Sequence, residues 1–207
     1  STSAILDEKY HKLIVDTHLA YIESGAEVIT TNTFSSRRIR MDQNKVSRYF
    51  EYANKKACEL AIQAKQNSKK EVFIAGSIPA QFDTYKEDTR DDEIISSAFF
   101  DQINCISDYV DFLYLDVISS GREIDLATKI IEKLDKPILL GIHLTKNGCL
   151  PSGETISQVL KKYKSTNWIG IIAACVSLEI AENSINELQL QNLPFGYKVN
   201  LWGQDEP

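Results

Sequence analysis

The sequence lacks the features that mark a nucleic-acid-binding or membrane protein. It has 23 Lys and Arg against 29 Asp and Glu, a formal net charge of -6, and its pI is about 5.2. No basic excess is therefore available to bind the phosphates of nucleic acids or an anionic membrane surface. No apolar run approaches the roughly 20 residues of a membrane-spanning helix. Because the start from Ser1 to Asp7 is short and polar, we expect no signal peptide.

Cysteine and nucleotide-binding glycine motifs are also scarce. The four cysteines lie far apart and form no C-x-x-C pair: Cys58, Cys105, Cys149 and Cys175. We therefore expect a reduced, cytoplasmic protein rather than a disulfide-stabilised one. No G-x-G-x-x-G follows the first predicted strand, and no G-x-x-x-x-G-K-[ST] occurs. Neither of these nucleotide-binding loops is indicated.

The sequence does contain helical and strand patterns that alternate almost without interruption. Helical spacing of apolar residues predicts helices over 7–24, 44–66, 91–106, 123–134, 154–163 and 178–188. Short apolar or β-branched runs predict strands over 28–31, 72–76, 112–115, 138–142, 168–174 and 195–199. Such alternation is typical of a parallel sheet in an α/β protein.

The fold class is best described as a TIM-type (β/α)8 barrel in one domain, residues 1–207. A doubly wound sheet is the alternative. A typical barrel of this type has about 250 residues, and this chain has 207 residues. With only about six β/α units visible, we expect an incomplete barrel.

Polar residues gather where the predicted strands end, which is where the chemistry of parallel α/β folds is found. The candidates are Asn32, Thr33, Ser77, Asp116, His143 and Cys175. Each also has a structural interpretation. Asp116 and Ser77 could cap the next turn or helix, Asn32 and Thr33 could hold a loop, His143 could be a buried structural histidine, and Cys175 could be a small apolar residue.

Several segments, in order, resemble the homocysteine S-methyltransferase family from about Ser1 to Trp202. They are Gly25-Ala26 with Thr31-Asn32-Thr33-Phe34, Ala75-Gly76-Ser77-Ile78, Leu115-Asp116 followed by Glu123, Gly148 to Gly153, Ile169 to Cys175, and Asn200. Each segment is weak alone, but their order and spacing are fairly specific. The resemblance implies the barrel fold and transfer of a methyl group to the thiol of homocysteine, as in methionine biosynthesis.

The resemblance also implies a zinc cofactor held by three cysteines, of which Cys175 matches one. Zinc would bind the homocysteine thiol and lower its pKa, and the thiolate would attack a methyl donor that varies within the family. Asp116 matches the carboxylate that binds the substrate amino group. Asn32, Thr33, Ser77 and His143 would line the same site.

The sequence departs from the family pattern at several points. It has no adjacent cysteine pair and no Asp-Gly-Gly strand at its start, so we expect the first and last barrel strands to be missing. Ala174 replaces an Asn, Asp116 replaces a Glu, and Pro79-Ala80 replaces Gly-Pro. Only one of the three zinc cysteines, Cys175, is therefore present.

Three hypotheses remain open from the sequence. The first is zinc-dependent methyl transfer to homocysteine. The second is a divergent, non-catalytic member that acts as a binding or assembly protein, in which a second copy or a partner chain covers the open sheet edges. The third is a different barrel enzyme that uses Asp116, His143 and Glu123 without a metal.

Overall fold

The computed structural model describes residues 2–200. Ser1 and residues 201–207, which include the end of the sequence resemblance at Trp202, lie outside the described residues. The helices are α1 (Thr2–Leu6), α2 (His11–Glu23), α3 (Arg38–Gln43), α4 (Phe50–Ser68), α5 (Asp92–Ile106), α6 (Gly121–Ile131), α7 (Ile156–Lys162) and α8 (Leu178–Gln189). The strands are β1 (Val28–Thr30), β2 (Phe73–Pro79), β3 (Phe112–Ile118), β4 (Ile138–Ile142), β5 (Trp168–Val176) and β6 (Phe195–Val199).

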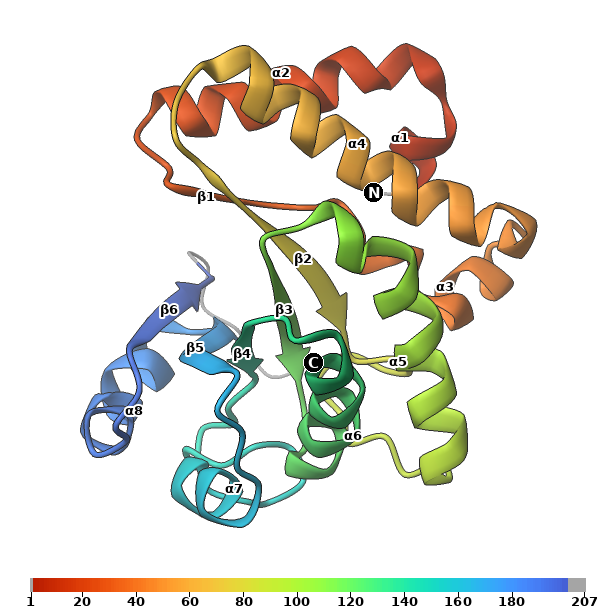
Figure 1. Cartoon of the computed structure of the whole chain (residues 1–207). Helices are drawn as coiled ribbons and strands as arrows, with labels where there is room; N and C mark the ends of the chain where they lie inside the picture. Colours follow the sequence, from red (N-terminus) through yellow and green to blue (C-terminus); the bar gives the residue numbers. More distant parts are fainter. Residues whose placement is uncertain (1, 201–207) are drawn as a thin grey trace.

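The six strands form one parallel sheet in the order β1-β2-β3-β4-β5-β6. A doubly wound sheet would reverse its strand order at a switch point, and no such reversal occurs. Each strand lies beside its neighbour in the sequence, and the sheet curls into a half-barrel (Figure 1). The prediction of an incomplete TIM-type barrel with six β/α units is thus confirmed.

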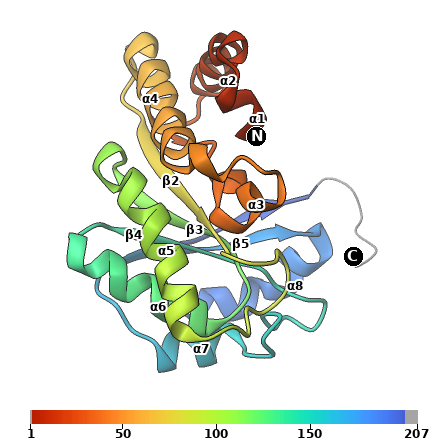
Figure 2. The same ribbon diagram turned by 90° about the vertical axis from the view of Figure 1, so that its right-hand side faces the viewer.

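The main core lies between the sheet and the helices on its outer face. β3 is buried along its whole length because it lies between β2 and β4 and is covered by α5 and α6. Figure 2 shows α5 and α6 side by side on one face of the sheet. Leu113 and Leu115 of β3 belong to the same buried cluster as Phe99 of α5 and Ile124 of α6. This apolar contact fixes the orientation of β3, and with it the position of Asp116.

A smaller cluster covers the inner face of the sheet. It contains Ala75, Phe112 and Tyr114, with Leu139 packed against them. Gly141 makes this packing possible. A Cβ atom there would lie 2.5 Å from Cε2 of Tyr114 and 2.6 Å from the backbone oxygen of Leu115.

The N-terminal helices form a separate layer. α1, α2 and α4 share a second apolar cluster that includes Ile5, Ile14, Val15, Ala53 and Ala57. α2 and α4 lie side by side above the sheet (Figure 1). The sheet itself stays open, because β1 and β6 each pair with only one strand within residues 2–200.

Some predicted boundaries are wrong, for identifiable reasons. The helix expected over 44–66 begins only at Phe50, because Lys45 adopts a left-handed backbone conformation with φ of 57° and Ser47–Tyr49 form a 3-10 turn. The strands expected to end at Gly76 and Leu115 continue to Pro79 and Ile118. Asp116 therefore lies within β3 rather than after it.

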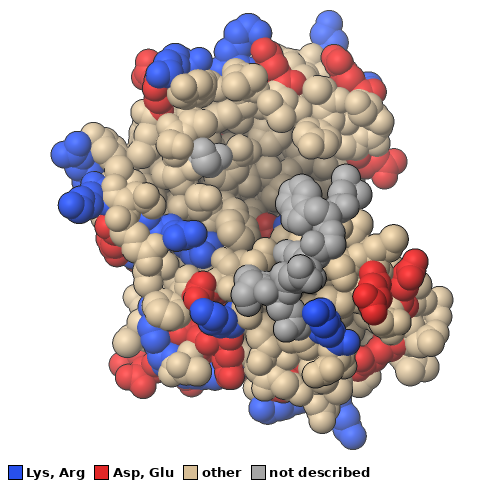
Figure 3. Space-filling model, turned by 180° about the vertical axis from the view of Figure 1, so that it is seen from behind, with Lys and Arg blue, Asp and Glu red and all other residues tan. Residues whose placement is uncertain are grey.

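The surface agrees with the charge balance of the sequence. On the face seen in Figure 3, Lys and Arg are interspersed with Asp and Glu, mostly toward its outer edge, with uncharged surface between them. Within the described part of the chain, no helix is long and apolar enough to span a membrane.

The close approach at Gly141 generates a stability prediction. We expect Gly141→Ala to lower the free energy of unfolding by about 1–3 kcal/mol, because the new Cβ would clash with the backbone oxygen of Leu115, which can move only if strand β3 moves. The matched control is Gly196→Ala in β6, where the nearest atom would be Cγ1 of Ile172 at an ordinary 3.9 Å. We expect that change to stay within about 0.5 kcal/mol. Urea unfolding measures both, and equal effects would contradict this account.

Candidate functional site

The carboxylate of Asp116 is the centre of the polar cluster at the carboxyl ends of the strands. Its side chain is only 5% exposed. The hydroxyl of Ser77 donates to Oδ2 over 3.0 Å, and Nζ of Lys198 donates to Oδ1 over 2.5 Å. The three residues come from β2, β3 and β6. We call Ser77, Asp116, Cys175 and Lys198 the rim cluster.

Two backbone distortions shape this rim. Val117, next to Asp116, has φ of 63°, and Cys175 has φ of 56°. The strand register shifts at both places, between Leu115 and Ile118 in β3 and between Ala174 and Val176 in β5. Bulges of this kind re-aim side chains beside active sites. Each left-handed residue costs about 1–3 kcal/mol, which the surrounding packing must offset.

Cys175 and His143 share a neighbour, Tyr85, from the loop between β2 and α5. The rings of Tyr85 and His143 have centroids 4.5 Å apart. Nδ1 of His143 donates to the backbone oxygen of Ala174 over 3.3 Å, and burial lowers the pKa of His143. Burial raises the pKa of the Cys175 thiol and the Asp116 carboxylate acts in the same direction, while the charge of Lys198 and the hydroxyl of Tyr85 only partly offset this increase.

The loop that carries Tyr85 is held on both sides of that residue. Nη2 of Arg37 donates to Oγ1 of Thr84 over 3.0 Å, and Arg90 pairs with the buried Asp88 at 2.6 Å. Tyr85 itself has a left-handed backbone with φ of 71°. These contacts fix the ring of Tyr85 against His143.

The hydroxyls after β1 support Ser77. Oγ1 of Thr33 donates to the backbone oxygen of Ser77 over 2.6 Å, and the Ser77 amide donates to Oγ1 of Thr31 over 3.1 Å. Thr33 is fully buried. Asn32 lies beside His18 of α2. Burial lowers the pKa of His18, and the hydrogen bond with Asn32 offsets part of this decrease. The structure thus joins Thr33 to the cluster through Ser77 and places Asn32 next to α2.

Glu123 forms a different group. Its Oε2 accepts from the Ser120 hydroxyl over 2.7 Å, and the carboxyl is fully buried. Burial raises its pKa to about 7, and the nearby carboxylate of Asp88 acts in the same direction. Glu123 therefore interacts with Ser120 and Asp88, and not with Asp116 or His143. No contact therefore supports a combined role for Asp116, His143 and Glu123.

Sequence reasoning missed Lys198 and Tyr85. Lys198 lies near the carboxyl end of the strand predicted over 195–199, the end of the sheet at which the candidate residues were expected. That signal could have directed attention to Lys198. Tyr85 lies in an irregular loop, and nothing in the local sequence indicates that it reaches His143.

The described residues do not fit a zinc ion on their own. Within residues 2–200, no group of three or more His, Cys, Asp or Glu side chains could hold a metal. Cys58 and Cys105 lie in α4 and α5. The site also places the Lys198 ammonium where it acts on the Cys175 thiol, and a neighbouring positive charge opposes the binding of a second cation.

The curled sheet of parallel strands, with polar groups at its carboxyl rim, defines an α/β protein with an incomplete TIM-type barrel. The family is identified by sequence. The sequence model of the homocysteine S-methyltransferase family matches residues 1–204, and the chain belongs to this family. A search of curated protein sequences gives no match.

Solved structures show the same fold. The homocysteine methyltransferase MmuM from Escherichia coli, in its metallated form, superposes with a TM-score of 0.78 at 17% identity, covering 95% of this chain and 77% of that chain. Its oxidized form gives a TM-score of 0.77 at 14% identity, covering 97% and 83%. At these identities the likeness concerns the fold.

The burial of Glu123 predicts a pH dependence of stability. The pKa of this carboxyl is about 7 in the folded protein against an ordinary 4.5. Above pH 4.5 the unfolded chain releases the proton while the folded protein retains it, so the free energy of unfolding falls until about pH 7. The loss is on the order of 3 kcal/mol. Glu123→Gln should remove this loss of stability. Urea unfolding should therefore show that the free energy of unfolding of the variant exceeds that of the wild type by more at pH 7.5 than at pH 4.5. A constant difference would contradict the burial effect.

The poor fit to zinc predicts a low metal content. Protein purified without chelator should contain well below one zinc per chain by plasma mass spectrometry, and Cys175→Ala should change this little. About one zinc per chain that disappears in Cys175→Ala would contradict the prediction. It would show that Cys175 is a ligand together with groups outside the described residues.

Proposed function

We propose that the protein transfers a methyl group from a small-molecule donor to the thiol of homocysteine, forming methionine in the cytoplasm. The observation that carries this proposal is the buried carboxylate of Asp116 in β3, the residue that the sequence resemblance matches to the family's substrate-binding acid. Family membership supplies the reaction class, and the rim cluster supplies a site of matching chemistry.

Asp116 would bind the α-ammonium of homocysteine. A carboxylate shielded from water forms a strong charge-assisted hydrogen bond with an ammonium group. Ser77 fixes Oδ2 of Asp116 by donating to it over 3.0 Å, so Oδ1, which Lys198 contacts in the structure, has a defined orientation for an ammonium group. Thr31 and Thr33 hold Ser77 in place.

The reactive sulfur would lie at the Cys175 side of the rim. There the positive charge of Lys198 would stabilise the thiolate of a bound substrate, although burial holds the pKa of the Cys175 thiol itself above its usual value. In the transfer, the thiol proton leaves to solvent, a sulfur lone pair forms the new S–CH3 bond, and the donor heteroatom keeps the electrons of the bond that breaks. Zinc remains a family expectation, and no step of this proposal depends on it.

A second candidate is a non-catalytic member that binds or assembles without methyl transfer. Two observations favour it. Asp116 is already paired with Lys198, and residues 2–200 contain no three-residue metal group. The open edges at β1 and β6 would then offer surfaces to a second copy or a partner chain.

The first test is methionine formation from homocysteine with a panel of donors: a methylated folate, a betaine, S-methylmethionine and S-adenosylmethionine. We expect turnover with at least one donor. Asp116→Asn should lower kcat/KM by about 10- to 100-fold, mainly through KM, because a charged hydrogen bond to the substrate is lost. Homocysteine binding without turnover by any donor would favour the non-catalytic candidate.

A further inference from the structure

The partner of Asp116 in the structure, the ammonium of Lys198, is the same chemical group as the α-ammonium of an amino acid. Nζ of Lys198 lies 2.5 Å from Oδ1 of Asp116 and 5.4 Å from the centroid of the Tyr114 ring. An ammonium therefore already occupies the position that the α-ammonium of an amino acid would take. Binding of homocysteine at Asp116 requires Lys198 to move.

The two members of this ion pair differ in their freedom to move. Asp116 is 5% exposed and is held by Ser77 and by the buried strand β3. Lys198 is 44% exposed in β6, an edge strand of the described sheet, and its flexible four-carbon stem can swing into solvent. The carboxylate cannot be left unpaired without a large penalty. An exchange of partners at Asp116 is therefore the motion that the packing allows.

We propose that Lys198 binds the α-carboxylate of the amino-acid substrate after the α-ammonium has replaced it at Asp116. The ion pair would open around the zwitterion, so that Asp116 pairs with the ammonium and Lys198 pairs with the carboxylate. Every charge then keeps a partner. A ligand with only an ammonium would leave Lys198 without a partner, and a ligand with only a carboxylate would find Lys198 already paired with Asp116. This inference rests on the proposed function, because it assumes a thiol amino acid at this site.

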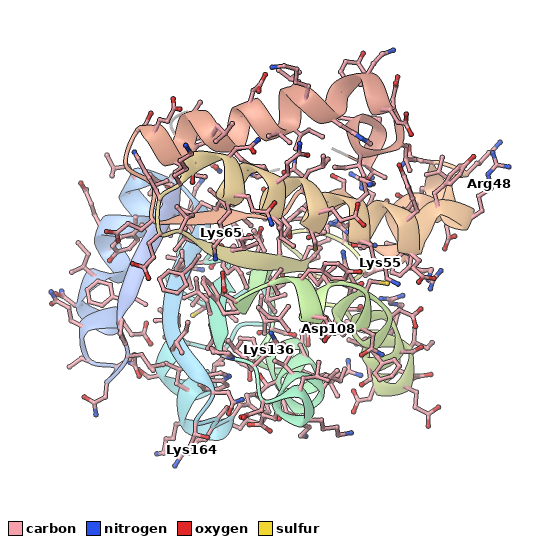
Figure 4. The ribbon with its side chains drawn as sticks, turned by 45° about the horizontal axis from the view of Figure 1, so that its top comes forward. Arg48, Lys55, Lys65, Asp108, Lys136 and Lys164 are labelled. Atoms are coloured by element: carbon pink, nitrogen blue, oxygen red, sulfur yellow. The ribbon has the colours of Figure 1, made fainter. Side chains whose placement is uncertain are left out.

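Three thiols of matched length separate the two contacts. Homocysteine carries both charges, 3-mercaptopropan-1-amine lacks the carboxylate, and 4-mercaptobutanoate lacks the ammonium. Isothermal titration calorimetry would compare their binding to the wild-type protein and to Lys198→Met. The matched control is Lys164→Met, since Lys164 is exposed before β5, at the opposite end of the strands, and points away from the molecule (Figure 4).

We expect Lys198→Met to weaken homocysteine binding by about 10- to 100-fold, the usual effect of losing a charged hydrogen bond. The same variant should bind 3-mercaptopropan-1-amine as well as or better than the wild type, because the competing ammonium is gone. Lys198→Arg should restore most of the homocysteine affinity, since guanidinium also pairs with carboxylate. Lys164→Met should behave as the wild type.

Several outcomes would overturn the inference. If Lys198→Met binds homocysteine as tightly as the wild type or more tightly, Lys198 only competes for Asp116. If the variant loses affinity for all three thiols equally, its role is structural. Failure of the proposed function is distinguishable, because the ligand preferences can hold while no donor gives methionine. Absence of binding by every thiol to the wild type would overturn both proposals.

Discussion

The parallel, sequential order of the strands is the constraint on which the rest of the structure depends. A parallel strand needs a long crossover connection, and sequential crossovers of one hand place the connecting helices on the same face of the sheet. All carboxyl ends then meet at one rim. Ser77 and Lys198, which are 39 and 82 residues from Asp116 in the sequence, reach its two carboxylate oxygens for this reason.

The rim cluster combines burial with opposite charge. Asp116 is shielded by the packing of β3, and Lys198 compensates its charge from the more exposed β6. Beneath this pair, the inner face is filled by Tyr114, whose ring fits because Gly141 has no Cβ. Burial raises the pKa of Tyr114, so its phenol stays neutral. The charged groups at this point are therefore Asp116 and Lys198, and they are complementary to an amino-acid zwitterion.

The chain belongs to a methyltransferase family, but its rim has a composition of its own. The single cysteine of the cluster lies beside an ammonium and a tyrosine hydroxyl rather than beside further metal ligands in residues 2–200. The two left-handed residues, Val117 and Cys175, mark the bulges that end β3 and β5 at this rim. These two positions are where backbone strain within the described strands lies, beside the buried carboxylate of Asp116.

The sequence by itself determined the fold class, the six strands and the family, because apolar periodicity and short ordered segments are local properties. It also predicted that Asp116, Ser77, His143 and Cys175 lie at strand ends, although Ser77, Asp116 and Cys175 prove to lie within the last residues of their strands. Only the tertiary structure decided which of these residues meet. It joined Lys198 to Asp116 and Tyr85 to His143, and it placed Asn32 beside His18 and Glu123 beside Ser120. Such pairings depend on the curl of the sheet, on bulges and on loop paths, which arise from packing between distant segments and leave no local pattern.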